Sequence, residues 1–528
     1  MSRNVRVDYF PLRGGLDLRS PMLQADPGSA ALLVNFEVAT TGGYARTVGY
    51  ERFDGQASPA EASYKGAADA RRAVIEKVPG VGPVRGVAVY DGRVWAIRDD
   101  ESAQARLYKS TELGWEEVDT PTRAGGGRYE FATYNFSGST DDMALYGVDG
   151  VNKPFELKGE TLTELDTGVT SVMPEHIVAH KSHLFVSYPG GSVQHSGIGD
   201  PTNWDASTGG AGEVAQGDEV TAMAGIKGDA LAIFGRNSIR VLYGNSEADW
   251  KQETLSNQAD AAGALPYTVQ TLREPLFLDD IGLRSLSAVD AYGNFTTGTL
   301  SEVVRPLIEE MRYEAVTSLV LRDRNQYRLL DKKGRCLILT MGGDGMLGFG
   351  LAKYPFTPTC AYHGEVDGRQ MAVIGSDDGF VYRLDKGNSF DGEPIPASLR
   401  LNFHIAKSPT TQKRWRKAVI DITTTGMQTI KLQPIFNFGH ADVEAATVSD
   451  TSRVVVTDLQ GLAEAGGVWD VDEWGEFVWD GQLLSEAYAD ITGSGRSMAL
   501  VIYSEGVDAP PFTLNGVVLH YSLRGLRR

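Results

Sequence analysis

The sequence predicts a mainly β fold, and three features support that prediction. Glycine is abundant, with 61 residues in a chain of 528, or roughly 12% against a usual share of about 7%. Between residues 84 and 394, short apolar runs recur and reverse at Asp-Gly or similar pairs, which is the pattern of β-hairpins. From residue 395 onward, turn pairs become sparser and strands longer. We therefore divide the chain into an N-terminal segment (1–83), a hairpin-rich domain (84–394) and a C-terminal β domain (395–528).

The spacing of the reversals indicates the architecture of the hairpin-rich domain. They fall near residues 91, 149, 181, 228, 279, 323 and 367, at intervals of 58, 32, 47, 51, 44 and 44 residues. Four-stranded propeller blades recur every 40–50 residues or so. We predict a degenerate six- or seven-bladed β-propeller, since no strict motif marks each blade. A long two-sheet sandwich is the alternative, because it also consists of strands and turns.

One helix interrupts the β pattern in the N-terminal segment. Ser58, Pro59 and Glu61 have the spacing of a capping box with proline at the first helical position, and an alanine-rich stretch follows. We predict a helix over about 59–78 and a shorter one within 301–313. The whole N-terminal segment, including its helix, is expected to pack on the C-terminal domain.

The C-terminal domain is predicted to be a β-sandwich-like platform that includes the N-terminal segment. Long strand patterns cover 397–403, 417–423 and 429–438, and further ones cover 498–503 and 516–521. The domain is nearly neutral, with 12 Lys and Arg against 15 Asp and Glu. Of the net charge of −19, −3 therefore lies in this domain and −16 in residues 1–394.

Charge and cysteine content exclude several classes of protein. A surface this acidic repels phosphate backbones, so sequence-specific nucleic-acid binding is not expected. Only Cys336 and Cys360 occur, which excludes a disulfide-dense secreted scaffold and a four-thiolate metal site. We find neither the apolar run of a signal peptide nor a stretch of about 18 apolar residues. We expect folding in a reducing cytoplasm, two free thiols and no membrane span.

No complete catalytic or cofactor-binding motif occurs. Glu175, His176 and His180 superficially resemble a zinc-protease helix, but the glutamate precedes the first histidine, where it cannot act as the base. We expect these histidines and His183 at the surface or rim of a hairpin. Asp470 begins a segment similar to a calcium loop, in which two ligands are missing. We predict that the protein is not an enzyme and has no catalytic residue, cofactor or bound metal.

Two clusters are candidate assembly contacts. Three tryptophans within eleven residues, flanked by acids, are typical of a packed core or an interface, with carbohydrate stacking as the alternative. The basic C-terminus is suited to contact a neighbouring subunit or an adaptor ring, with a solvated tail as the alternative. The candidates are Trp469, Trp474, Trp479, Arg524, Arg527 and Arg528.

Several short segments, mostly at the two ends of the chain, share features with one group of proteins. They are FPLRGGL (10–16), NFE (35–37), GGYAR (42–46), YERFDG (50–55), the tryptophan segment (469–481) and LHYSLRG (519–525). These segments resemble tail nozzle or tail hub proteins of short-tailed bacteriophages. The resemblance implies a ring, expected to be sixfold, below the portal and adaptor rings. It also implies a propeller on a β-rich platform, and a bore that carries DNA out of the capsid.

We therefore predict a structural virion protein. It would form an oligomeric tail ring that extends the portal–adaptor channel, retains packaged DNA and lets it pass on ejection. Expected partners are five further copies of the chain, the adaptor or portal ring, tail fibres or spikes, and double-stranded DNA that passes without sequence-specific binding. Assembly is expected in the host cytoplasm, and the final location is the virion tail. The alternative is a propeller-based carbohydrate-binding module or glycan hydrolase associated with a phage tail, because paired carboxylates can build such a site.

Overall fold

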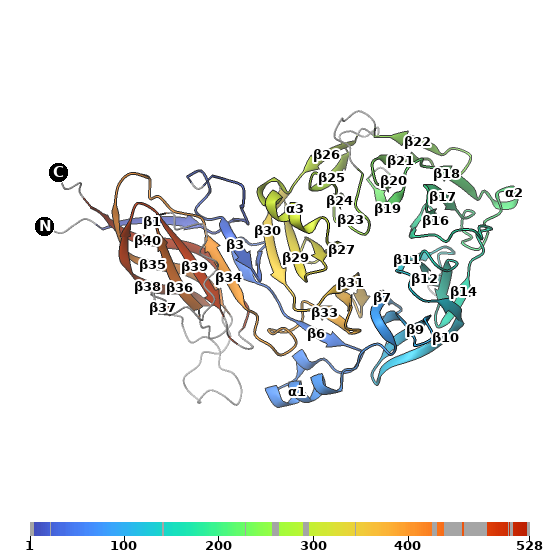
Figure 1. Ribbon diagram of the computed structural model, residues 1–528, viewed down its shortest axis with the longest axis horizontal. Coiled ribbons are helices and arrows are strands. Elements are labelled where there is room, and N and C mark those ends of the chain that lie inside the picture. The colour runs from blue at the N-terminus through green and yellow to red at the C-terminus, as the bar shows by residue number, and fades with distance from the viewer. Residues whose placement is uncertain are drawn as a thin grey trace.

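The structure is a computed structural model in which a ring of β-sheets lies beside a smaller β platform (Figure 1). It describes residues 5–21, 23–139, 142–227, 229–255, 263–288, 295–343, 345–424, 430–437, 457–458, 483–504, 506 and 510–524. Strands dominate these residues, which confirms the mainly β prediction. None of their helices is long and apolar enough to cross a membrane.

The ring is a β-propeller, as predicted. Six blades are separate four-stranded sheets, and a seventh four-stranded unit is part of a ten-stranded sheet that continues into the platform. The innermost strands of successive blades contact one another around the ring, and the last contacts the first.

The strands of each blade are given below from the innermost strand outward. Blade 1 is β7 (Val81–Tyr90), β8 (Arg93–Asp99), β9 (Gln104–Thr111) and β10 (Gly114–Ala124); blade 2 is β11 (Glu130–Asn135), β12 (Met143–Val148), β13 (Phe155–Lys158) and β14 (Thr161–Glu164). Blade 3 is β15 (His176–His180), β16 (His183–Tyr188), β17 (Ser192–His195) and β18 (Gly212–Ala215); blade 4 is β19 (Val220–Ile226), β20 (Ala230–Gly235), β21 (Ile239–Tyr243) and β22 (Lys251–Thr254). Blade 5 is β23 (Gln270–Thr271), β24 (Pro275–Leu278), β25 (Leu283–Ala288) and β26 (Phe295–Thr299); blade 6, the shared unit, is β27 (Ala315–Leu321), β28 (Gln326–Asp331), β29 (Arg335–Gly342) and β30 (Gly345–Lys353). Blade 7 is β31 (Pro358–Val366), β32 (Arg369–Ser376), β33 (Val381–Leu384) and β6 (Tyr50–Phe53).

Aspartate and glycine close hairpins at predicted positions. Asp91 and Gly92 have φ of 51° and 69° between β7 and β8, and Asp367 and Gly368 have 51° and 71° between β31 and β32. Two successive positive φ angles are characteristic of the type I′ turn, which glycine and aspartate tolerate better than most residues. The local sequence therefore sets where these strands reverse.

The propeller ring is closed by a strand from the N-terminal segment. β6 pairs antiparallel with β33, with Tyr50 opposite Leu384, and supplies the outermost strand of blade 7. The Tyr50 ring also packs against Tyr354 and Phe390, with centroid distances of 5.6 and 4.9 Å. Residues 1–83 are therefore shared: their first five strands lie in the platform, whereas β6 belongs to the propeller.

The helix predicted over 59–78 is shorter than expected. A single 3-10 turn, η1 (Pro59–Glu61), precedes α1 (Lys65–Val74). Ser58 makes no capping bond, because its hydroxyl donates to the Glu51 carboxylate at 2.7 Å. The other helices are α2 (Ala206–Gly209), η3 (Glu302–Val304) and α3 (Arg305–Met311), the last two within the predicted 301–313.

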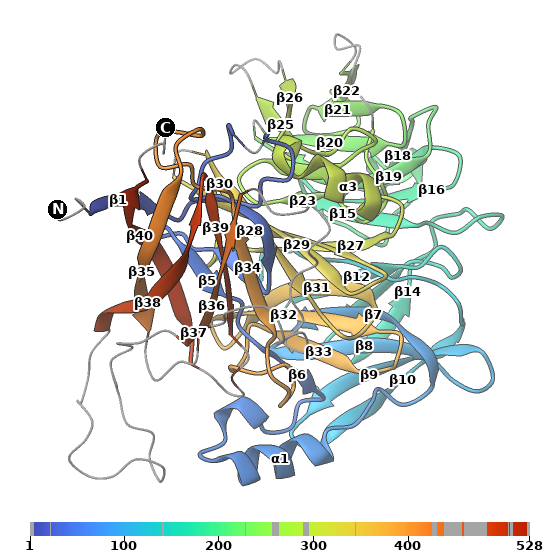
Figure 2. The same cartoon turned by 60° about the vertical axis from the view of Figure 1, so that its left-hand side comes forward.

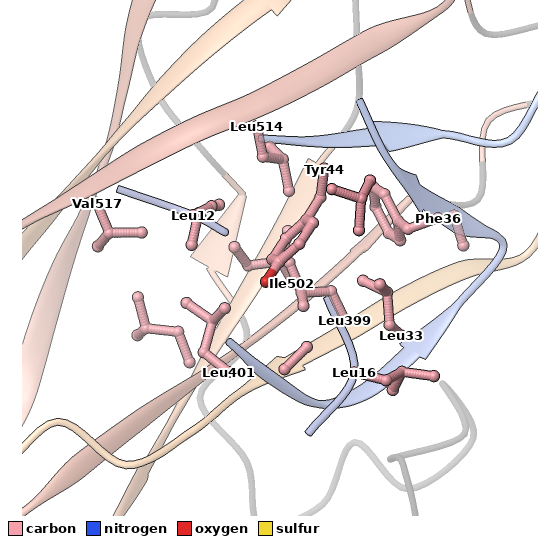
Figure 3. Packing of buried hydrophobic residues seen from close by; sticks show 14 of the residues in the cluster. Leu12, Leu16, Leu33, Phe36, Tyr44, Leu399, Leu401, Ile502, Leu514 and Val517 are labelled. Carbon is pink, nitrogen blue, oxygen red and sulfur yellow. The ribbon is translucent and has the colours of Figure 1, made fainter. Parts of the chain in front are cut away.

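The platform consists of two sheets that enclose one core, which confirms the sandwich-like prediction. Its six-stranded sheet has the order β38-β35-β40-β5-β4, with β1 also paired to β40; the platform part of the ten-stranded sheet has the order β3-β34-β39-β36-β37, and β2 pairs with β30. Tyr44 lies between the sheets, with its hydroxyl 2.7 Å from the carbonyl oxygens of Arg13 and Gly28 (Figure 3). The strands are β1 (Arg6–Pro11), β2 (Gly14–Gly15), β3 (Ala30–Val34), β4 (Phe36–Val38), β5 (Tyr44–Arg46), β34 (Ala397–Leu401), β35 (Lys413–Thr424), β36 (Ile430–Phe436), β37 (Thr457–Asp458), β38 (Leu483–Gly495), β39 (Met498–Ser504) and β40 (Phe512–Leu523).

A buried ionic cluster joins the platform to the propeller. The fully buried guanidinium of Arg328, on β28, lies 2.9 Å from the Asp385 carboxylate after β33 and 3.6 Å from the Glu37 carboxylate on β4. Arg324 also contacts both acids, at 2.7 Å to Glu37 and 3.5 Å to Asp385. Blade 6, blade 7 and the N-terminal strands are therefore held together at one point.

Candidate functional site

The structure describes one of the six predicted assembly residues. Arg524 is exposed just after β40, and its backbone N–H donates to the carbonyl of Gln412 at 2.9 Å. Trp469, Trp474, Trp479, Arg527 and Arg528 lie outside the described residues, as does Asp470 of the calcium-loop-like segment. Two other places, on the platform and on the propeller axis, have functional character.

The first place is the outward face of the six-stranded platform sheet. Tyr9 on β1 lies opposite Val518 on β40, Val518 lies opposite Val419 on β35, and Val419 lies opposite Tyr488 on β38. Side chains of residues opposite each other in register project to the same side of a sheet, so these four form a row. Val7, two residues before Tyr9, extends it; Val7, Tyr9 and Tyr488 are 58%, 57% and 37% exposed. We call these five residues the platform face.

The platform face points away from the propeller. Figure 2 shows β1, β40, β35 and β38 side by side on the far side of the platform. Gly516 on β40 makes room for the Tyr9 ring, because a Cβ at Gly516 would lie 2.7 Å from a ring carbon. The ring therefore lies against the sheet, where it forms one end of the row.

Charged groups of both signs border the platform face. The Lys417 ammonium lies 3.8 Å from the centroid of the Tyr488 ring, and in register Lys417 is opposite both Asp490 and His520. Asp421 lies on the other side of the row, two residues beyond Val419 on the same strand. The border is therefore mixed in charge rather than uniformly acidic.

β1 forms an open edge of this sheet. It pairs with β40 on one side, and no strand among the described residues pairs with its other side. The side chain of Asp8 holds β1 in place through a 2.9 Å contact with Nε2 of His404. An unpaired strand edge presents backbone N–H and C=O groups that another strand can extend.

The second place is a cavity of about 440 Å³ on the propeller axis. Its lining includes residues of the innermost strands of all seven blades, from Val87 on β7 to His363 on β31. An innermost strand pairs on its outer side only, so backbone polar groups face the axis. Arg128, Glu130, Tyr267 and His363 are among the lining residues with titratable side chains.

Arg128 contributes a positively charged guanidinium to this cavity. Its guanidinium carbon lies 3.4 Å from the centroid of the Tyr267 ring, and Nη2 donates to the carbonyl of Val316 at 2.6 Å. Burial lowers the pKa of Arg128 but leaves an arginine charged at neutral pH. Tyr267 has a positive φ of 60°, an unfavourable conformation for an aromatic residue. Burial also raises the pKa of Tyr267 to about 12, so its hydroxyl is neutral.

Further polar side chains of the cavity include those of Glu130, Tyr362 and His363. Glu130 accepts from the backbone N–H of Ile177 and contacts Nδ1 of His176 at 2.7 Å, so its carboxylate is held against blade 3. Toward the opposite end of the inner strands, the Tyr362 hydroxyl contacts that of Thr133 at 3.1 Å. Burial lowers the pKa of His363 to about 4, so this imidazole is neutral at pH 7.

The expectation that the histidines lie at a surface or rim is wrong for His176 and His183, which are both buried. His176 lies on β15 and His183 on β16, and side chains of both strands are covered by packing between blades, which the alternation of a single hairpin does not show. His183 donates from Nδ1 to the carbonyl of Ser196, while His195 stacks edge-on against Trp250 with ring centroids 4.0 Å apart. Across the described part of the chain, no three His, Cys, Asp or Glu side chains are placed to hold a metal ion. Cys336 and Cys360 are free, buried thiols.

Sequence reasoning missed both places. The strand patterns around 417–423 and 516–521 contain the signal for the platform face, since Val419 and Val518 are apolar residues out of phase with the inward set. Their alignment into one row depends on strand register, which no local pattern gives. Arg128 carried no sequence signal, because its partner Tyr267 lies far along the chain.

Comparisons with known proteins show no family for this chain. No protein-family model matches the chain, and no curated protein matches it. Among solved structures, the chain is similar to a streptogramin B lyase, with a TM-score of 0.41 and 13% identity over 59% of this chain and 95% of the other. It is also similar to the virginiamycin B lyase of Staphylococcus aureus (TM-score 0.40, 12% identity, 58% and 94% covered) and to the WD40 propeller domain of Doa1 (TM-score 0.36, 13% identity, 59% and 95% covered). These similarities have low identity and low TM-scores, and no conclusion about this chain is drawn from them.

Proposed function

We propose that this protein is a structural subunit that assembles with copies of itself into a tail ring of a short-tailed phage, as a nozzle or hub. The observation that carries the proposal is the platform face, a continuous apolar row beside the open edge of β1. Single exposed apolar residues such as Leu113, which is 94% exposed, are ordinary on protein surfaces. A row of five across four strands is different, because contiguous apolar patches mark interaction sites.

The size of the platform face suits a subunit contact. Full burial of a large apolar side chain contributes roughly 1.5–3 kcal/mol relative to leaving it exposed. Tyrosines are favoured anchors of interfaces, and Tyr9 and Tyr488 mark the two ends of the row. Partial burial of these five side chains would therefore supply several kcal/mol toward association.

The mixed charges at the border favour a second copy of the chain as the occupant. Lys417, Asp490 and Asp421 offer both signs within one face, so another copy can place an opposite charge against each. A strongly acidic partner would instead place negative charges against Asp421 and Asp490, and it would offer no cation to pair with them. The open edge of β1 offers backbone pairing to the same neighbour.

Two further features suit a tail ring. The shared ten-stranded sheet and the Arg328 cluster couple propeller and platform, so contacts made by one orient the other. The charge of −16 on residues 1–394 suits a bore through which DNA passes, because every missing cation removes a phosphate contact. We assign Arg524, Arg527 and Arg528 to docking on the adaptor ring as part of the same proposal.

Mass photometry and negative-stain microscopy of the purified full chain test the assembly. We expect closed rings with a central bore for the wild-type chain. Tyr9→Lys and Val518→Lys should remain monomeric, because each places a charge in the apolar row. Leu113→Lys is the matched control and should assemble like the wild type. A wild-type chain that stays monomeric at the highest attainable concentration, or rings that tolerate both platform variants, would refute the contact.

The phage role needs a separate test. Antibodies raised against the chain should label the tail of short-tailed virions in electron micrographs. Label confined to capsids, or absent from virions, would contradict the tail location. The carbohydrate alternative rests on tryptophans outside the described residues, and no observation on the described part of the chain favours it.

A further inference from the structure

The axial cavity contains a cation with no carboxylate of the described residues within ion-pair distance. Arg123, Arg284, Arg328 and Arg335 each contact an aspartate or glutamate, whereas the buried Arg98 is held by the backbone carbonyls of Gly82 and Val78. Among the described residues, Arg128 forms no ion pair; its contacts are the Tyr267 ring and the carbonyl of Val316. Arg128 is partly buried, and the nearby Glu130 favours its charged form without forming an ion pair, so the guanidinium can still pair with an anion in the cavity.

One donor of Arg128 is left for a ligand. Nη2 donates to Val316 and Nε is enclosed by protein, whereas Nη1 is not enclosed and makes no hydrogen bond among the described residues. Glu130 is the acid next in the cavity, and it is already held by His176 and the Ile177 amide. The guanidinium is fixed in orientation by the Tyr267 ring, whose strained backbone holds it there. Fixing a donor before the ligand arrives lowers the entropy lost on binding.

We propose that the axial cavity binds a small organic monocarboxylate, with Arg128 as its charged anchor. A carboxylate carries a single negative charge, so it meets less repulsion from Glu130 and from this acidic protein than a phosphate dianion would. Guanidinium groups pair with carboxylates in a planar, often bidentate geometry. The remaining wall offers Val87, Val269 and Tyr362 to an apolar body, and about 440 Å³ is within the size range of ligand sites.

Isothermal titration calorimetry of the full chain with sodium benzoate, at constant ionic strength, tests this site. We expect saturable binding to the wild-type chain and binding at least about tenfold weaker for benzamide, its neutral isostere, because a charge-assisted hydrogen bond contributes more than a neutral one. Acetate should bind more weakly than benzoate, because it lacks the apolar body. Inorganic phosphate should also bind more weakly than benzoate.

Variants locate the site within the cavity. Arg128→Gln should weaken benzoate binding at least about tenfold, and Arg128→Lys should retain part of it. Arg305→Gln is the matched control, because Arg305 is a half-exposed arginine on α3 that does not line the cavity; it should bind like the wild type. Absence of benzoate binding, equal binding of benzoate and benzamide, or unchanged binding by a folded Arg128→Gln chain would overturn the proposal. The comparison of benzoate with benzamide needs no variant, so it decides the question even if Arg128→Gln fails to fold. The cavity belongs to one chain, so this result is independent of ring assembly.

Discussion

Removing Arg328 should destabilise the protein, because Glu37 and Asp385 would lose the fully buried one of their two counter-ions. Arg328→Met keeps much of the side-chain volume but leaves Asp385 and Glu37, at 2.9 and 3.6 Å from the lost guanidinium, facing each other. Breaking a buried ion pair in this way costs roughly 3–5 kcal/mol. Arg324 still contacts both acids, so we expect the lower end, about 3 kcal/mol.

The assay is the free energy of unfolding from urea titrations at pH 7, compared with two further variants. The triple variant Glu37→Gln, Asp385→Asn, Arg328→Met removes all three charges and should lose less stability than Arg328→Met alone. Asn tolerates the positive φ of 54° at position 385. Arg305→Met, which breaks an exposed pair with Glu309 on α3, is the control and should cost less than about 1 kcal/mol. The reasoning is refuted if the triple variant is as destabilised as Arg328→Met, or if Arg328→Met matches the control.

Two other expected outcomes concern a buried histidine and a turn glycine. Burial lowers the pKa of His195 from 6.5 to about 4, so the unfolded chain binds more protons between these values and stability falls as pH drops through that window, by at most about 3 kcal/mol. His195→Phe should flatten the slope of unfolding free energy between pH 7 and pH 4 relative to the wild type, and parallel slopes would count against the assignment. Gly334→Ala should destabilise by more than about 2 kcal/mol, because φ is 73° and the new Cβ would lie 2.3 Å from the carbonyl oxygen of Tyr354. Gly92→Ala, with φ of 69° and open space around it, should cost only about 1 kcal/mol; equal losses in thermal melts would show that the contact does not matter.

Much of the propeller can be predicted from the local sequence, whereas only the outline of the platform can. Asp91-Gly92 and Asp367-Gly368 set their own turns, because positive φ angles depend on the residues in the turn itself. The capping box at Ser58 failed because Glu51, a residue on another element, competes for the hydroxyl. A local pattern predicts a local bond only where no tertiary partner competes for the same group.

The candidate sites were less predictable than the fold. The tryptophan and C-terminal arginine clusters were chosen by composition, and all but Arg524 lie outside the described residues. The platform face arises from register among four strands, and Arg128 meets Tyr267 across the propeller axis. Strand register and contacts across the propeller axis depend on the fold of the whole chain, so neither can be predicted from a short stretch of sequence.

The sequence by itself determined that the chain is mainly β, where its hairpins reverse, and that most of its negative charge lies before residue 395. Tertiary structure alone decided that β6 closes the ring beside β33, that blade 6 continues into the platform, and that Arg128 lies on the axis with no ion-pair partner among the described residues. The physical reason is the separation along the chain over which each interaction acts. Turn chemistry and alternation act between neighbours along the chain, whereas strand pairing and charge compensation act between residues that are hundreds of positions apart and meet only when the whole fold is assembled.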